Sequence, residues 1–222
     1  MFVLILAGFV QSANSQKATE FMGPILGNEI EDVRKLISAG ADVNEEFNFG
    51  ATGKITALFL AVTLGRTEIC MVLIDSGANV HIIVQGMTLL HNVALSSGDY
   101  EETAALLIAK GLDVNAKVTY REAKDATPLH IAAGKGNVSV ARLLIQNGAE
   151  VNAKLPYNGF TSLHLAAQNG HEKVAELLIA KEADINAKSM YGETPIDLAM
   201  SKEHKELAEL LRKHGGLSGK QK

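Results

Sequence analysis

Seven histidines are the residues of this 222-residue chain whose chemistry best suits acid–base catalysis or metal binding. Three of them, His91, His130 and His164, hold the fourth position of a recurring six-residue phrase that begins with threonine. Zinc requires its ligands about 2 Å from the ion, whereas packed helices lie about 8–10 Å apart. Because one histidine per repeat does not converge on one ion, we expect a structural role for all three.

Patterns typical of nucleophilic or cofactor chemistry are missing from the sequence. The hydroxyls of Ser96, Ser97 and Ser162 lie near histidines in the chain, but serine at helix starts and breaks is an ordinary cap. No G-x-S-x-G sequence occurs, and the glycines are not spaced as in a dinucleotide or phosphate loop. We therefore expect no catalytic residue, no metal ligand and no cofactor.

The phrase that contains the histidines occurs five times. Its copies are TALFLA at 56–61, TLLHNV at 88–93, TPLHIA at 127–132, TSLHLA at 161–166 and TPIDLA at 194–199. A second phrase of the type Ala-Asp-Val-Asn recurs at 41–44, 78–81, 112–115, 149–152 and 183–186. A period near 33 residues with T-P-L-H-x-A is the signature of ankyrin repeats. The chain resembles that family over residues 17–216.

This resemblance implies an all-α solenoid, in which stacked helix–turn–helix units carry projecting β-turn or hairpin finger loops. We expect one repeat domain over residues 16–216 and a disordered tail at 217–222. The six expected units are 17–44, 45–81, 82–115, 116–152, 153–186 and 187–216. The outer two would act as caps, because a terminal repeat needs a polar outer face.

Single residues mark the ends of the expected helices. Thr161 is a candidate N-cap before an apolar run with helical spacing. A glycine ends most second helices, and Glu182 stands where this glycine is expected. The asparagine of the second phrase, as in Asn152, is expected to bond to the backbone of its own turn.

The first sixteen residues carry no charge and include an apolar run at 2–10. This resembles a secretory signal peptide over residues 1–15, and the run is too short to span a bilayer. The expected location is therefore periplasmic or secreted, with mature protein beginning near Gln16. No Lys or Arg precedes the run, so two alternatives stay open: a cytoplasmic protein, or an apolar segment that covers the first repeat.

Bulk composition narrows the function further. The chain has 21 basic and 25 acidic residues, a net charge of −4, which does not indicate nucleic-acid binding. Its one cysteine, Cys70, excludes an internal disulfide and is expected to be a buried hydrophobe. We predict a monomeric, non-catalytic scaffold that binds a protein partner, with no membrane insertion of the mature chain. The alternatives are a regulatory, stabilising or inhibitory partner of an exported enzyme, or an enzyme or metal-dependent regulator.

Two features place the expected contact surface. The finger loops at 45–55 and 116–126 are about four residues longer than that at 187–193, and such insertions often mark the binding face. Six of the eleven Phe and Tyr residues lie in finger segments, and aromatic side chains are enriched in interface cores. The predicted finger contacts are Phe47, Phe49, Tyr120, Arg121, Tyr157, Asn158, Phe160 and Tyr191. The predicted contacts on the concave inner-helix face are Thr63, Leu64, Lys135, Gln168 and Asn169.

Overall fold

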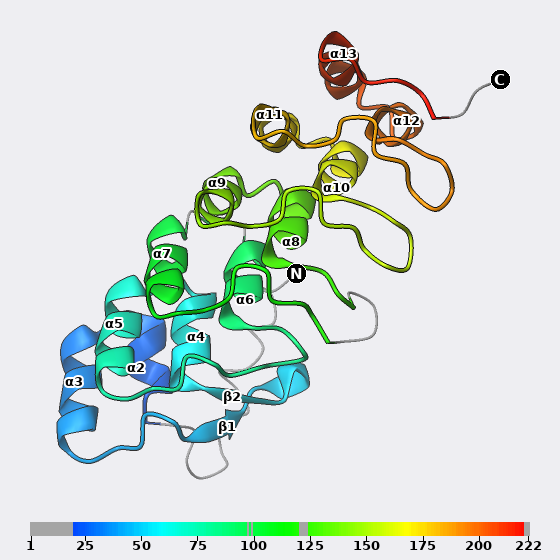
Figure 1. Cartoon of the computed structure of the whole chain (residues 1–222). Helices are drawn as coiled ribbons and strands as arrows, with labels where there is room; N and C mark the ends of the chain where they lie inside the picture. The colour runs from blue at the N-terminus through cyan, green and yellow to red at the C-terminus, as the bar shows by residue number, and fades with distance from the viewer. Residues whose placement is uncertain (1–19, 97, 99, 120–123, 220–222) are drawn as a thin grey trace. The chain divides into compact units, whose positions relative to one another are not determined.

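The structure is a computed structural model that describes residues 20–96, 98, 100–119 and 124–219. The expected signal peptide at 1–15 and the predicted contacts Tyr120 and Arg121 lie outside these residues. Twelve α-helices, one short hairpin and one 3-10 helix, η1 (Gly50–Thr52), make up the regular structure described (Figure 1). They divide into two compact blocks, an N-terminal block that ends at Gln85 and a C-terminal block that begins at Gly86.

The N-terminal block contains two helix pairs and one hairpin. Its elements are α2 (Met22–Gly27), α3 (Ile30–Ser38), β1 (Glu46–Asn48), β2 (Lys54–Thr56), α4 (Ala57–Thr63) and α5 (Thr67–Asp75). Helix α2 packs on α4 and α3 packs on α5. In the hairpin, the first finger loop, Phe47 pairs with Ile55 and both side chains are buried.

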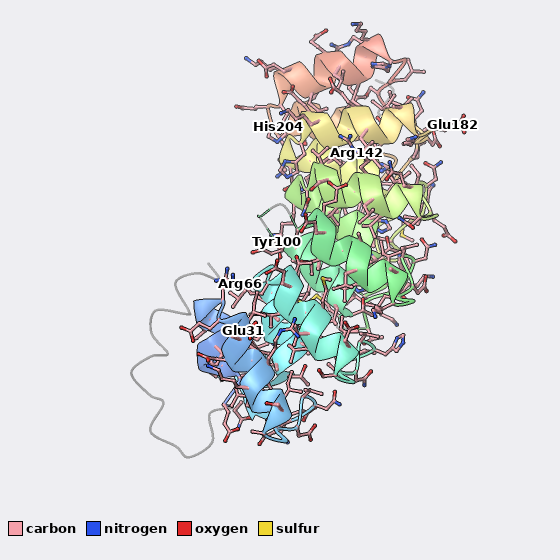
Figure 2. All side chains as sticks on the ribbon, turned by 90° about the vertical axis from the view of Figure 1, so that its left-hand side faces the viewer. Glu31, Arg66, Tyr100, Arg142, Glu182 and His204 are labelled. Carbon is pink, nitrogen blue, oxygen red and sulfur yellow. The ribbon has the colours of Figure 1, made fainter. Side chains whose placement is uncertain are left out.

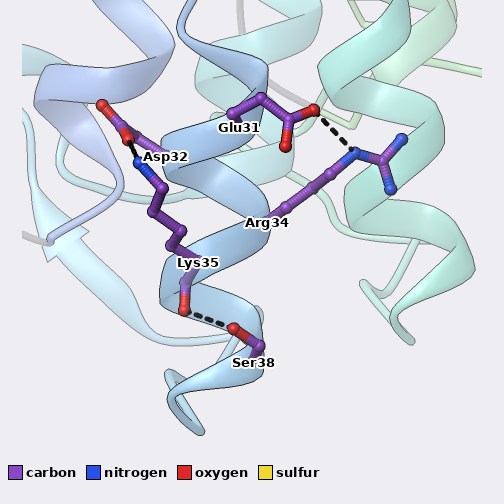
Figure 3. A network of polar contacts seen from close by, with 5 residues as sticks. All are labelled: Glu31, Asp32, Arg34, Lys35 and Ser38. Atoms are coloured by element: carbon purple, nitrogen blue, oxygen red, sulfur yellow. Dashed lines mark hydrogen bonds and ion pairs between the residues drawn. The ribbon is translucent and has the colours of Figure 1, made fainter.

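Charged side chains form two ion pairs along α3 (Figure 3). Lys35 Nζ lies 2.7 Å from an Asp32 carboxylate oxygen, and Arg34 Nε lies 3.7 Å from Glu31. These pairs are largely exposed and screened by solvent, so each contributes little to stability. A polar face of this kind suits an opening repeat.

The C-terminal block consists of two layers of helices. The inner layer holds α6 (Leu89–Leu95), α8 (Pro128–Lys135), α10 (Ser162–Asn169) and α12 (Pro195–Ser201); the outer layer holds α7 (Glu101–Ala109), α9 (Val138–Gln146), α11 (Glu172–Ala180) and α13 (Lys205–Lys213). Consecutive helices pack within each layer, and each inner helix packs on the outer helix that follows it (Figure 1). The predicted all-α solenoid of helix pairs is confirmed. None of the described helices is long and apolar enough to cross a membrane.

The threonine of the repeated phrase begins the inner helices. Thr161 Oγ1 accepts a hydrogen bond from the His164 amide, and Thr127 does the same for His130, as the N-cap prediction requires. The interior that follows is made of small and branched residues. Ala132, Ala133, Ala166 and Ala167 are fully buried, which lets neighbouring helices approach closely.

Glycine in the left-handed region ends most of the second helices of the pairs, as predicted. Gly40, Gly77, Gly111 and Gly148 have φ between 88° and 93°. Glu182 takes the same place after α11 with φ of 61°. A residue with a Cβ is strained there, because the Cβ approaches the following carbonyl oxygen.

Replacing Glu182 with glycine is therefore expected to raise the free energy of unfolding by about 1 kcal/mol. Gly148→Ala is the matched reverse change. It should lower stability by a similar amount, since no atom lies within 4 Å of the added Cβ and only backbone strain remains. Denaturant unfolding followed by circular dichroism measures both. An unchanged or lowered midpoint for Glu182→Gly would show that α11 does not end in the expected way.

The repeated asparagines connect one repeat to the next, which corrects the expectation that they bond within their own turn. Asn152 Nδ2 donates to the Glu182 carbonyl at 3.2 Å, and its Oδ1 accepts from the Asp184 amide at 2.8 Å. The local turn is closed by the aspartate two residues earlier instead, as when Asp184 accepts from the Asn186 amide. Each such bridge carries hydrogen bonds at both ends of one amide, so the turns of successive repeats hold each other in register.

Residues 217–219 are also held in place by hydrogen bonds, which corrects the expected disorder for this part of the tail; residues 220–222 lie outside the described residues. Asn186 Oδ1 accepts from the Leu217 amide at 2.7 Å, the same bridge that joins complete repeats. Thr194 Oγ1 donates to the Leu217 carbonyl at 2.8 Å, and the Gly219 amide donates to Asp197 at 2.8 Å. Asp197 stands where three other repeats have histidine, and its carboxylate secures a short tail in place of another finger.

Candidate protein-binding face

The fingers of the C-terminal block are attached to its inner helices by the repeated histidines. Nδ1 of His130 accepts from the Thr127 amide at 3.3 Å, and its Nε2 donates to the Ala153 carbonyl of the next finger at 3.0 Å. His91 reaches the Ala126 carbonyl at 3.1 Å and His164 the Glu193 carbonyl at 3.2 Å in the same way. Both ring nitrogens are thus used in structural hydrogen bonds, as expected for these three residues.

This arrangement holds the imidazoles in their neutral form. Burial lowers the pKa of His130 to about 4, although the backbone carbonyls of Ala153 and Phe160 oppose the shift. Burial also lowers the pKa values of His91 and His164. A proton on Nδ1 would face the threonine amide that donates to that nitrogen, so protonation removes one bond of the capping box.

The other ends of the inner helices are held by the turns between helices. His171 Nε2 donates to the Gly134 carbonyl at 3.1 Å, and His204 Nε2 donates to the Gln168 carbonyl at 3.2 Å. Asn137 Nδ2 similarly bonds to the Ser96 carbonyl at 3.3 Å. Because both ends are tied to a neighbouring repeat, the inner helices present their exposed side chains on a rigid frame.

An apolar cluster lies where the fingers meet the inner helices. Its buried members are Val118, Ala126, Leu155, Phe160 and Leu198, and Met87, Ile131 and Leu165 pack against it. The Phe160 ring stacks on the His164 imidazole, with ring centroids 5.2 Å apart. The cluster fixes the base of two fingers against α8, α10 and α12.

A hollow of about 220 Å³ opens beside this cluster. Its walls come from three inner helices and two fingers, and they are lined by Leu95, Ala126, His130, Ile131, Gly134, Lys135, Leu155, Tyr157 and Leu165. Tyr157 is 53% exposed and Leu95 is 37% exposed. Pockets for small ligands usually have about 300–1,000 Å³, so the hollow fits one or two apolar side chains better than a metabolite.

Two predicted finger contacts are buried, which corrects the expectation that their rings are exposed. Phe47 is 6% exposed and Phe160 is 7% exposed. Phe47 faces the interior from the hairpin, and Phe160 belongs to the apolar cluster. The two rings pack within the chain and are not accessible to a partner. Phe49 is half-buried.

Four other predicted contacts belong to the fingers and inner helices of the C-terminal block. Tyr157 and Lys135 line the apolar hollow together. Tyr191 is 68% exposed on the next finger. Asn158 folds back on its own finger, where its Oδ1 accepts from the Phe160 amide at 2.9 Å.

The remaining predicted contacts lie at the C-terminal ends of inner helices. Gln168 and Asn169 end α10, and Asn169 Nδ2 donates to the Leu165 carbonyl at 2.8 Å. Thr63 and Leu64 lie at the end of α4 in the N-terminal block, where Thr63 Oγ1 donates to the Phe59 carbonyl at 2.7 Å.

The sequence prediction missed the apolar wall of the hollow. Leu95, Ile131 and Leu165 were not among the predicted contacts, although all three line it. The available signal was positional. Ile131 and Leu165 occupy the same place in their repeats, directly after the buried histidine, and both are only half-buried.

A groove of about 710 Å³ lies on the turn side of the same block. Its charged lining residues are Glu101, Lys135, Arg142 and Lys173, and Figure 2 shows Arg142 on α9. In the N-terminal block, a groove of about 690 Å³ between α3 and α5 is lined mainly by acidic side chains. Its carboxylates are Glu29, Glu31, Asp32, Glu68 and Asp75, and Arg34 is the one basic side chain among the described residues that line it.

Comparison with known proteins agrees with this geometry. The family profile described as "Ankyrin repeats (3 copies)" matches residues 24–118, 116–189 and 158–221. The chain is 42% identical over 93 residues to Ankyrin repeat and KH domain-containing protein 1 from Homo sapiens, and equally similar to mask-1 from Caenorhabditis elegans. Each match covers 41% of the chain but only 4% and 3% of those much longer relatives. The chain therefore belongs to the ankyrin repeat family, whose repeats form protein–protein interaction scaffolds.

Proposed function

We propose that the chain is a non-catalytic scaffold that binds a protein partner through the finger and inner-helix side of its C-terminal block. One observation carries the proposal. The exposed ring of Tyr157 borders an apolar hollow whose other walls include Leu95, Ile131 and Leu165. Exposed aromatic side chains beside a pocket are typical anchors of protein interfaces.

Rigidity supports this assignment. The inner helices are hydrogen-bonded at one end to the fingers through His130 and His164, and at the other end to the turns through His171. A surface that is already ordered loses little conformational entropy when a partner binds. A loop-based site on such a frame keeps its contact residues in place.

The titratable groups support binding over catalysis. The buried histidines are neutral and use both ring nitrogens within the fold, as described for His130. Burial raises the pKa of the Cys70 thiol to about 12, so this cysteine remains a thiol at neutral pH and is a poor nucleophile. We propose that the protein acts as a monomer with no enzymatic activity and does not bind nucleic acid.

Export is a separate proposal. The uncharged, apolar start of the chain resembles a signal peptide, and an exported protein of this kind would bind or regulate a partner outside the cytoplasm. Mass spectrometry of the mature N-terminus tests it on protein purified from its source. A chain beginning near Gln16 supports export, whereas an intact Met1 contradicts it.

Replacing Tyr157 with alanine is expected to weaken the natural complex by about 2 kcal/mol, which is the usual threshold for an interface hot spot. The loss follows from removing an exposed ring at the rim of the apolar hollow. The partner is first recovered with the full chain as bait, identified by mass spectrometry and produced separately. Titration calorimetry then compares the affinity of the unchanged chain and of the Tyr157→Ala variant for this partner.

Glu176→Ala is the matched control, because Glu176 is exposed on α11 in the outer layer. Its effect on affinity should stay within about 0.5 kcal/mol, as for ordinary surface changes. Circular dichroism verifies that both variants fold. If Glu176→Ala abolishes binding and Tyr157→Ala leaves it unchanged, the recognition face lies on the outer layer and the proposal is wrong.

A further inference from the structure

Two hollows of the C-terminal block share one residue, Lys135, at the end of α8. On one side lies the apolar hollow of about 220 Å³ bordered by Tyr157 and Leu165. On the other side lies the turn-side groove of about 710 Å³ that reaches Arg142 and Lys173. A partner segment that enters the apolar hollow and continues past Lys135 therefore arrives in this groove.

The groove is electropositive where such a segment would lie. Lys135, Arg142 and Lys173 are exposed, and no ion pair or hydrogen bond joins any of the three to another described side chain. Glu101 is the one carboxylate among the described residues that line the groove. Unpaired cations concentrated in a groove attract an anionic partner and hold it in register.

The neighbouring elements add few opposing charges on this side. The inner helices α6, α8 and α10 contain no Asp or Glu in their sequences. The other carboxylates near the groove by sequence are Glu102 on α7, Glu172 and Glu176 on α11, and Asp99. The three glutamates do not belong to its lining, and Asp99 lies outside the described residues. This excess of basic over acidic side chains in the groove favours a partner that carries carboxylates.

We propose that the partner contributes an acidic segment with one apolar anchor. The anchor, a large aliphatic or aromatic side chain, occupies the hollow beside Tyr157. Asp or Glu residues next to it pass Lys135 and pair with Arg142 and Lys173. This inference rests on the proposed protein-binding function and specifies the chemistry of the partner.

A protein segment fits these two hollows better than a nucleic acid does. The first hollow is lined mainly by apolar side chains and has the size of a side chain. Nucleic-acid binding surfaces instead combine an extended basic patch with aromatic platforms, and only Val138 among the groove's lining residues has a large apolar side chain.

A peptide library tests the proposal with a defined probe. Random 16-residue peptides are displayed and selected on the full-length chain at physiological salt. We expect the enriched peptides to share a large apolar residue followed or preceded by at least two Asp or Glu residues. Synthetic copies of the best peptides then give dissociation constants by fluorescence anisotropy.

Charge reversal in the groove supplies the decisive comparison. Arg142→Glu combined with Lys173→Glu should raise the dissociation constants of the peptides by at least about tenfold, because the attraction between the groove and the acidic residues becomes repulsion. Lys205→Glu combined with Lys213→Glu on α13 changes the net charge equally but lies outside both hollows. This control should change the dissociation constant by less than about twofold, as expected for screened, distant charges.

The possible outcomes separate the two proposals. Enriched peptides that require Tyr157 but are neutral or basic, or that tolerate the Arg142 and Lys173 reversals, overturn the acidic-segment inference and leave the protein-binding proposal intact. Peptides whose binding is unchanged by Tyr157→Ala, or a selection that enriches no peptide, contradict both the inference and the protein-binding proposal. A 20-nucleotide single-stranded DNA is the second probe, and its binding with loss on reversal of Arg142 and Lys173 would also overturn the inference.

Discussion

Replacing Phe160 with alanine is expected to lower the free energy of unfolding by about 3 kcal/mol, the usual cost of deleting a buried phenylalanine side chain. The ring is 7% exposed, stacks on His164 and packs with Leu155 and Leu198 in the apolar cluster. Its loss leaves a cavity at the junction of finger and inner helix. Denaturant unfolding followed by circular dichroism measures the change.

Tyr157→Ala is the control for this prediction, because Tyr157 lies three residues earlier on the same finger but is 53% exposed. Its effect on stability should stay within about 0.5 kcal/mol. The two variants should therefore have different effects: Tyr157→Ala lowers the affinity for the partner, and Phe160→Ala lowers the stability of the fold. Equal stability of the Phe160→Ala variant and the unchanged protein would contradict the packing described for the cluster.

Acidification is expected to destabilise the fold through its buried histidines. Burial lowers the pKa of His130 from an unfolded value near 6.5 to about 4 in the folded chain. A group whose folded pKa is lowered stabilises the fold above pH 6.5, and this stabilisation is lost as the pH falls from 6.5 to about 4. The linkage relation gives a total loss of about 3 kcal/mol for His130, and the lowered pKa values of His91 and His164 act in the same direction.

The pH range of the experiment separates histidines from carboxylates. Between pH 7.5 and 5.5, ordinary carboxylates remain ionised. Burial raises the pKa of Asp197, but hydrogen bonds from Ser218, Thr194 and Gly219 together hold it below its usual value. His130 alone should cost about 1 kcal/mol over this range. Urea unfolding at both pH values, with the His130 ring followed by NMR, measures the effect. Constant stability, or a His130 ring that titrates near pH 6.5, would contradict the proposed role of burial.

The repeat architecture was predictable from the sequence because its signals are local. The threonine caps, the capping-box contact of the histidine three residues later and the glycine after most outer helices act within one repeat, as at Thr161, His164 and Gly148. The left-handed conformation of Glu182 followed from its place in the same pattern. Signals of this kind need no knowledge of the neighbouring repeat.

Features that depend on contacts between repeats were not predicted correctly. The burial of Phe160 arises from packing against residues of other repeats, such as Leu198, and its finger position alone indicated exposure. Asn152 was expected to hydrogen-bond to the backbone of its own turn, yet its side chain bonds to the backbone of Glu182 and Asp184 in the next turn. The ordered tail likewise depends on Asp197, whose replacement of histidine was recognised without its consequence.

The prediction of the binding face was limited by the same difficulty. Tyr157 and Lys135 were chosen as contacts from their loop and helix-end positions, and the structure brings them to one hollow. The apolar wall formed by Leu95, Ile131 and Leu165 was missed because residues with helical apolar spacing are usually assigned to the core. Half-buried inner-helix positions differ from core positions only once the stacking is known.

Methyl NMR of the complex tests the central claim most directly. With methyl-labelled protein and its purified partner, the account predicts shifted or broadened signals for Leu95, Ile131 and Leu165, which line the apolar hollow. Signals of Leu143 on α9 and Ile179 on α11 should stay unchanged, because neither residue lines the hollow or the turn-side groove. Perturbation of Leu143 and Ile179 with unchanged signals at the hollow would show that the partner binds a part of the outer helices away from the hollow and the groove, contrary to this account.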